Sequence, residues 1–172
     1  MGRLLLIPFL CSLLLAGCGF QLRGSQALPE TVNQVAVGSV RAHSPLARAL
    51  LTRLDVYDIN GIRESELQNT DNTVLVRILP ESLERRLLSV YPTGQVAEYE
   101  LIYGVKYVVQ FPDAEAVSAY FEVLRDYQDD PDQVLAKSRE LELVLQEMRE
   151  EAADRIIRRL PSQAPRTMTV VE

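Results

Sequence analysis

Apolar residues in the first part of the chain recur with two different periods. Between Thr31 and Gly38 they are rich in β-branched types and end at a glycine, which predicts a first strand. After it they recur every three or four positions, as one face of a helix requires, and Ser44 and Pro45 suit its first turn as N-cap and N1 residues. A turn at Asn60-Gly61 is expected to follow. The helical apolar positions are Leu46, Ala49, Leu50 and Leu54.

From Thr73 to Tyr127 the apolar period changes to that of strands. Three apolar runs are separated by turn residues at 91–94 and 111–113, which is the pattern of an antiparallel meander. In the middle run, alternation predicts that every second residue from Ala97 to Tyr107 faces the core, and the third run alternates in the same way. Pro80 breaks the first run, which places that stretch at a sheet edge or a bulge.

The last expected element is a long helix. Asp130 would cap it, and Pro161 would stop it after Leu160. At 1.5 Å per residue such a helix is roughly 45 Å long. Its apolar stripe comprises Val134, Leu141, Val144, Leu145, Met148, Ala152, Ile156 and Leu160.

The order strand, helix, three strands, helix predicts an α+β fold. We expect a two-layer sandwich, with two helices packed on one face of a four-stranded, mostly antiparallel sheet. Two helices cannot cover the other face, which must therefore meet solvent or a partner. Tyrosines suit a contact surface because the ring is apolar and the hydroxyl polar, although they also suit ordinary half-buried strands. The strand tyrosines are Tyr91, Tyr99, Tyr103, Tyr107, Tyr120 and Tyr127.

The N-terminal segment has the three parts of a secretory signal. Arg3 supplies a positive charge, an apolar run extends from Leu4 to Leu15, and small residues precede Cys18. The run is too short to span a bilayer. The sequence Leu-Ala-Gly-Cys matches the bacterial lipobox, so we expect cleavage before Cys18 and lipid on its thiol. Gly19, in place of an aspartate, favours the periplasmic side of the outer membrane. A plain secretory signal or a short helical anchor is the alternative.

Length and cysteine usage then set the expected domain organisation. Cys11 lies in the signal and Cys18 is consumed by lipid, so the mature domain holds no disulfide and must rely on one apolar core. We expect a signal peptide at 1–17, a lipidated tether at 18–30, one domain at 31–160 and a flexible C-terminal tail at 161–172. The net charge of −6 becomes −7 once Arg3 is removed, which argues against nucleic-acid binding.

Residues that could support catalysis are scarce. His43 is the single histidine, so a metal site of histidines and cysteines is excluded by count, and there is no glycine-rich phosphate loop. The carboxylates of the last helix are spread over its exposed face, where solvation explains them. We expect no enzyme, metal or cofactor; a hydrolase would require a pocket that pairs His43 with an acidic group and a nucleophile.

Four stretches, in this order, resemble the LptE family of lipopolysaccharide-assembly lipoproteins. They are CGFQLRG at 18–24, SPLARA at 44–49, GQVAEY at 94–99, and the run from QEMR at 146 to RRL at 160. The resemblance implies a fold similar to the predicted one and a non-enzymatic role. The lipoprotein would sit as a plug inside the outer-membrane β-barrel LptD, assist its assembly, and bind lipopolysaccharide during insertion into the outer leaflet. A polar barrel lumen suits a hydrophilic, tyrosine-bearing surface.

Lipopolysaccharide is anionic, so its phosphates require lysine or arginine at one end of the domain. Strand ends and the start of the long helix can converge at one tip, although a solvated surface charge is the alternative for each cation. Two strand tyrosines, at positions expected to be exposed, are candidates for partner or lipid contact. The candidate cations are Arg85, Arg86, Arg125 and Lys137, and the candidate tyrosines are Tyr99 and Tyr103.

Two other classes of function stay open at this point. A general periplasmic scaffold lipoprotein would join an envelope complex without binding lipid, so charge reversal of the four cations would leave lipopolysaccharide binding unchanged. A lipid shuttle would carry its cargo in a large apolar cavity inside the domain, whereas a plug would have a filled core.

Overall fold

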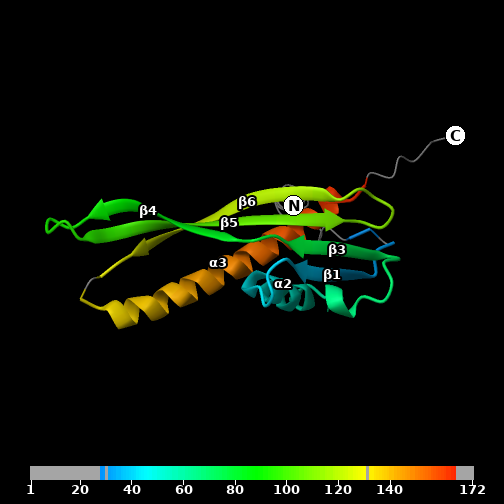
Figure 1. Cartoon of the computed structure of the whole chain (residues 1–172), viewed down its shortest axis with the longest axis horizontal. Helices are drawn as coiled ribbons and strands as arrows, with labels where there is room; N and C mark the ends of the chain where they lie inside the picture. The colour runs from blue at the N-terminus through cyan, green and yellow to red at the C-terminus, as the bar shows by residue number, and fades with distance from the viewer. Residues whose placement is uncertain (1–27, 30, 131, 166–172) are drawn as a thin grey trace, which may run out of the picture.

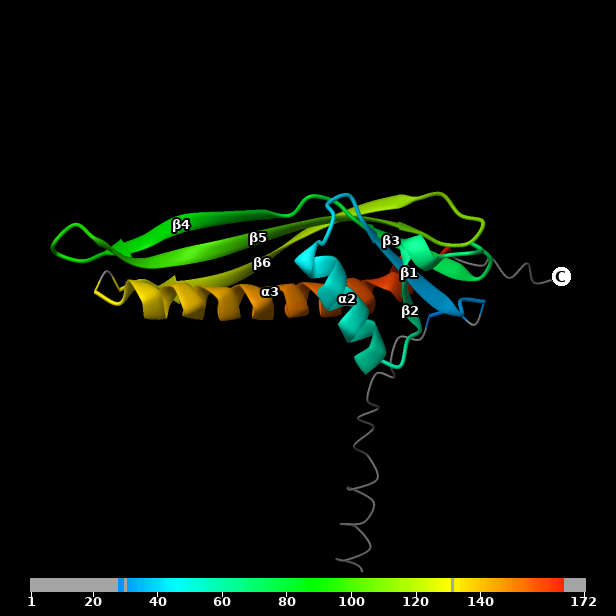
Figure 2. The same cartoon turned by 60° about the horizontal axis from the view of Figure 1, so that its bottom comes forward.

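Two layers make up the part of the chain that the computed structural model describes, residues 28–29, 31–130 and 132–165. A six-stranded sheet forms one layer, and helices α2 (Pro45–Val56) and α3 (Val134–Gln163) lie on one of its faces (Figure 1; Figure 2). The predicted α+β class is confirmed. The signal, Cys18 and most of the tether lie outside the described residues, as do residues 166–172.

The sheet has six strands where the sequence predicted four. The extra strand β2 is three residues long, too short for alternation to reveal, and begins where only a turn was expected. The predicted first run is two strands, β3 and β4, separated around Pro80; both pair antiparallel with β5, one after the other along the same edge. The strands are β1 (Gln34–Ser39), β2 (Gly61–Arg63), β3 (Thr73–Ile78), β4 (Ser82–Val90), β5 (Val96–Gln110) and β6 (Val117–Gln128).

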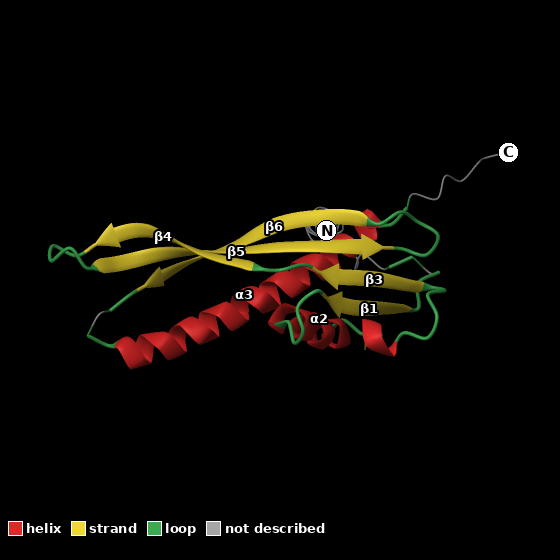
Figure 3. Ribbon diagram, in the orientation of Figure 1, coloured by secondary structure: helices red, strands yellow, loops and turns green. Residues whose placement is uncertain are grey.

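Strand order makes the sheet mixed. β1 lies between β2 and β3 and is parallel to both. β3, β4 and β6 all run antiparallel to β5 (Figure 3). A parallel pair needs a crossover connection, which α2 supplies between β1 and β2. The path β2-β1-β3-β5-β4 ends at β4, so β4 is an edge strand among the described residues.

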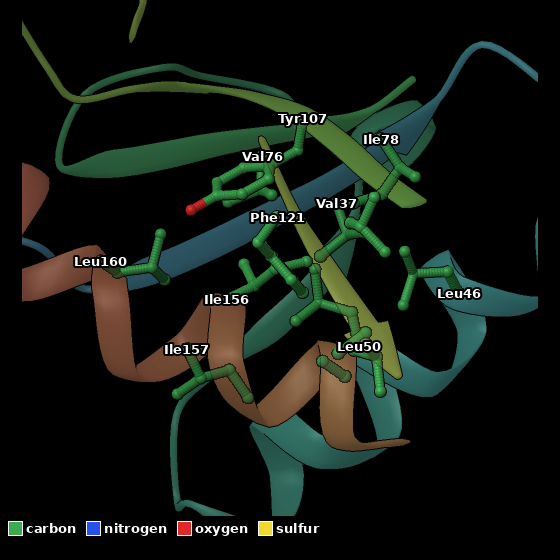
Figure 4. Packing of buried hydrophobic residues seen from close by; sticks show 14 of the residues in the cluster. Val37, Leu46, Leu50, Val76, Ile78, Tyr107, Phe121, Ile156, Ile157 and Leu160 are labelled. Carbon is green, nitrogen blue, oxygen red and sulfur yellow. The ribbon is translucent and has the colours of Figure 1, made fainter. Parts of the chain in front are cut away.

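The apolar core lies between the sheet and the helices. The predicted alternation in β5 is confirmed, since Leu101, Tyr103, Val105 and Tyr107 are all buried. Ser44 caps α2 as expected: its Oγ accepts a hydrogen bond from the Ala47 amide at 3.2 Å. Figure 4 shows how the two helices meet the sheet, through Leu46, Leu50, Ile156, Ile157 and Leu160 on the helices and Val37, Val76, Ile78, Tyr107 and Phe121 on the strands.

Helix α3 differs from its prediction at both ends. It begins at Val134 rather than directly after Asp130, because Asp130 instead closes a turn by accepting from the amides of Asp132 and Gln133 at 3.0 and 3.1 Å. It continues through Pro161 to Gln163, so residues 161–163 are helical and not part of a tail. A proline here removes a hydrogen bond only in the last turn.

Side-chain contacts explain where α3 ends and which part of it is buried. Gln163 Nε2 donates to the Tyr107 hydroxyl at 3.0 Å, which holds the last turn against β5. The apolar stripe is fully buried only from Met148 onward, whereas Val134 is 67% exposed. No described helix is both long enough and apolar enough to cross a membrane.

Candidate functional site

The β4–β5 hairpin and the start of α3 project together beyond α2 (Figure 2). We call this end the tip: residues 85–101 of the hairpin, 125–128 of β6 and 134–141 of α3. It contains all four candidate cations: Arg85, Arg86 and Arg125 lie on strands, and Lys137 lies in the first turn of α3. The tip is therefore the place where the predicted convergence of strand ends and helix start can be examined.

Strand register sorts the side chains of the tip onto two faces. Leu87, Tyr99 and Tyr127 are direct cross-strand neighbours, and the next row of the same face is Arg85, Leu101 and Arg125. Residues that pair directly point to the same side of a sheet. Because Leu101 is buried in the core, this is the side on which the helices lie.

Two cations of the tip lie over tyrosine rings on the helix side. The Arg85 guanidinium carbon is 6.0 Å from the centre of the Tyr99 ring, and Lys137 Nζ is 5.5 Å from the centre of the Tyr127 ring. Both distances suit cation–π attraction. The Tyr127 hydroxyl also donates to the Lys137 carbonyl oxygen at 2.6 Å, which fixes the start of α3 against β6.

Neighbouring groups shift the pKa values of Lys137 and Tyr127. Lys137 Nζ bonds Glu140 Oε2 at 2.9 Å, and this hydrogen bond raises the pKa of Lys137, so the ammonium stays charged at neutral pH. Burial raises the pKa of Tyr127, while Lys137 and Arg85 both act in the opposite direction. Arg85 and Lys137 therefore act electrostatically on the same ring.

The other two predicted cations are placed differently. Arg125 lies in the row next to Tyr99 and Tyr127, and its Nη2 donates to Glu151 Oε2 of α3 at 2.9 Å. Arg86 points to the opposite, helix-free face, where it forms an ion pair with its cross-strand neighbour Glu100. Arg85 and Arg86 also lie in the middle of β4 rather than near its end. The structure thus brings Arg85 and Lys137 together, keeps Arg125 nearby, and separates Arg86 from them.

The candidate tyrosines are less exposed than expected. Tyr103 is only 3% exposed, so the expectation that it occupies an exposed position is wrong; its side of β5 faces the helices, as the alternation itself indicated. Tyr99 is half-buried against the core. Whether either contacts a partner stays a prediction. Among the tyrosines that lie in described strands, Tyr120 is exposed, at 51%, on the helix-free face; its position next to the buried Phe121, on the other face by alternation, was the available signal.

Exposed apolar side chains at this end were not predicted. Nearly all residues of β4 are exposed, and one edge of the strand is unpaired among the described residues. Large apolar side chains in the open and an unpaired edge both favour contact with another molecule. These side chains are Leu87, Leu88, Val90 and Tyr91 of the hairpin and Val134 and Leu135 of α3.

The described residues contain no group of three or more potential metal ligands. His43 is exposed in the loop before α2, with a left-handed φ of 60°.

Comparison with known proteins assigns the family. A family model described as "LptE: Lipopolysaccharide-assembly" matches residues 30–160. The chain belongs to the LptE family. The LPS-assembly lipoprotein LptE of Photorhabdus laumondii is 34% identical over 157 residues, covering 91% of this chain and 84% of that protein. The LptE of Pectobacterium atrosepticum is 32% identical over 155 residues, covering 90% and 83%.

A solved structure agrees with this assignment. The crystal structure of rare lipoprotein B from Shewanella oneidensis is similar at a TM-score of 0.65 with 43% identity, over 76% of this chain and 96% of that one. The resemblance read from the four sequence stretches is thereby confirmed. LptE proteins are lipopolysaccharide-assembly lipoproteins and not a known enzyme family.

Proposed function

We propose that this chain is lipidated at Cys18, faces the periplasm from the outer membrane, and forms a complex with the β-barrel LptD. It sits in the barrel lumen as a plug, assists barrel assembly, and binds lipopolysaccharide during insertion into the outer leaflet. Membership in the LptE family supports the role in lipopolysaccharide assembly. The tip supports lipopolysaccharide binding, and the helix-free face of the sheet supports a position inside the barrel lumen.

The observation that carries the binding step is the pair of cations held over aromatic rings. Arg85 and Lys137 present positive charge on one side of the tip, as the phosphates of lipopolysaccharide require. Leu87 and Leu135 expose apolar surface at the same end, which suits acyl chains. Arg125 lies in the next row, where it is paired with Glu151 of α3.

The helix-free face supports the plug. Within the tip it presents two polar rows, Arg86–Glu100–Asp126 and Ser89–Glu98–Gln128, flanked by the exposed apolar residues Val90 and Leu124. A barrel interior is polar and water-filled, so the polar rows of this face can line the lumen. Tyr120, exposed on the same face, offers a ring for packing and a hydroxyl for hydrogen bonding.

Lipopolysaccharide binding tests the tip directly. We would compare the full chain in non-ionic detergent with R85Q/K137Q and with the control R86Q/R158Q, which removes the same charge from the helix-free face and from an exposed position of α3. We expect R85Q/K137Q to weaken binding about tenfold or more, since charge-assisted contacts are lost, and the control to change it about twofold at most. Equal effects in the two variants would refute the assignment to the tip.

Partner recovery separates the plug from the general scaffold. The intact lipoprotein would be purified from its own outer membrane and the proteins retained in detergent identified by mass spectrometry. A large β-barrel in roughly equal amount supports the plug, whereas soluble envelope proteins without a barrel support the scaffold. Tyr99→Ala tests the predicted tyrosine contact: unchanged barrel recovery would remove Tyr99 from the interface.

A further inference from the structure

A second feature lies outside the tip, at the carboxyl ends of β1 and β2. A cavity of about 660 Å³ opens there, between the end of β1, the loop into α2, and the end of β2. Its volume is within the range of small-molecule sites, roughly 300–1,000 Å³. The lining includes Gly38 and Ser39 of β1, Arg41 and His43 of the loop, Arg48 of α2 and Arg63 of β2.

The topology of the β1–α2–β2 unit brings three chain segments together around this cavity. β1 and β2 are parallel and α2 connects them, so the carboxyl ends of both strands and the start of the connecting helix meet at one place.

The first turn of α2 itself has few free donors for a ligand. Pro45 has no N–H, the Ala47 amide donates to Ser44 Oγ at 3.2 Å, and the Arg48 amide donates to the Ser44 carbonyl at 3.3 Å. Any anion in the cavity must therefore be held by side chains rather than by the helix end.

The charge of the lining is unusual in an acidic chain. Three arginines and a histidine face one carboxylate, Glu64, which is already paired with Arg77 of β3. Arg63 bonds Glu66 at 3.1 Å. Arg41 and Arg48 form no ion pair with any residue that the structure describes. The cavity thus keeps at least two unneutralised guanidinium groups in a protein whose net charge is −6.

We propose that this cavity binds a phosphate group carried on a small polar body, either a free phosphate ester or a phosphorylated lipid headgroup. Guanidinium groups bind phosphate oxygens through paired N–H donors, and a doubly charged phosphate uses more than one such group. The cavity volume exceeds that of phosphate alone, which leaves room for the body that carries it. The site uses elements outside the tip and does not depend on lipopolysaccharide binding there.

The test uses the full chain in a non-ionic detergent. Inorganic phosphate and glycerol 3-phosphate are titrated while the amide resonances of Gly38, Ser39 and His43 are followed by NMR, and phosphatidic acid is added to the micelles in a separate titration. R41Q/R48Q is compared with R139Q/R158Q, which removes two exposed arginines of α3 outside the cavity. Thermal unfolding of each variant shows that the fold is kept.

We expect saturable shifts of these amides, with the apparent Kd raised about tenfold or more in R41Q/R48Q and about twofold at most in the control. A response to glycerol 3-phosphate identifies a free phosphate ester as ligand, and a response to phosphatidic acid alone identifies a lipid headgroup. The proposal is overturned if none of the three probes shifts these amides or if both variants weaken binding equally.

Discussion

Substitution of Ile156 by alanine tests whether the second half of α3 carries the core. Ile156 is fully buried between the helices and the sheet (Figure 4). The change removes three carbon atoms, worth about 2.4 kcal/mol at roughly 0.8 kcal/mol for each buried CH₂. Incomplete collapse of the cavity adds to this loss, so we expect the free energy of unfolding to fall by about 3–4 kcal/mol.

The matched control is Leu143→Ala in the same helix. Leu143 is 63% exposed, and leucine and alanine are both good helix formers, so the expected change is within about 0.5 kcal/mol. Both variants would be unfolded in urea as full chains in non-ionic detergent, with the transition followed by far-ultraviolet circular dichroism. The reasoning is refuted if Ile156→Ala costs less than about 1 kcal/mol or if Leu143→Ala costs as much.

Three further outcomes are expected. Arg53 Nε and Nη2 donate to Asp154 at 2.6 and 3.0 Å between α2 and α3, and since both side chains are partly exposed, a double-mutant cycle with alanine should give a coupling of about 1 kcal/mol. Burial raises the pKa of Tyr103 above its ordinary value of 10.0, so the unfolded chain loses the hydroxyl proton at lower pH than the folded chain does. Stability should therefore fall as pH rises above about 10. Between about pH 9 and 11 the urea midpoint of Tyr103→Phe, which has no such proton, should fall less than that of the unsubstituted chain. A Cβ at Gly38 would overlap the Glu64 carboxylate, which is the far end of a flexible side chain paired with Arg77, so Glu64 can move aside and Gly38→Ala should lower the free energy of unfolding in urea by about 1 kcal/mol at most; a loss above about 2 kcal/mol would contradict this.

The two-layer α+β architecture could be predicted from the sequence, but the strand order of the sheet could not. Alternation in β5 and the three-to-four period in α2 are local signals, and both are confirmed. The place of β1 between two parallel neighbours depends on pairings with residues far along the chain, which no local pattern reveals. Likewise Pro161 predicts a helix end, but the contact of Gln163 with Tyr107 keeps the last turn helical.

The candidate cations show what the sequence can and cannot say about the site. Arg85 and Arg86 are consecutive in a strand, so alternation alone says that they point to opposite faces and cannot both contact one ligand from the same side. What it does not say is which of them lies on the side of α3, because that depends on the register between β4 and β5. The register places Arg85 with Leu101 and therefore on the helix side, with Lys137.

The core and the candidate contact surface are separated along the molecule. The buried parts of α2 and α3 lie over β1, β3 and the adjoining parts of β5 and β6, whereas β4 and the first turns of α3 leave apolar side chains in the open. Leucines on an unpaired edge strand do not stabilise an isolated chain and promote association with other strands. Because the other half of the molecule supplies its own core, the tip can be shaped for a partner without loss of the fold. This division explains why Leu143 should be neutral in the free chain while Ile156 is not.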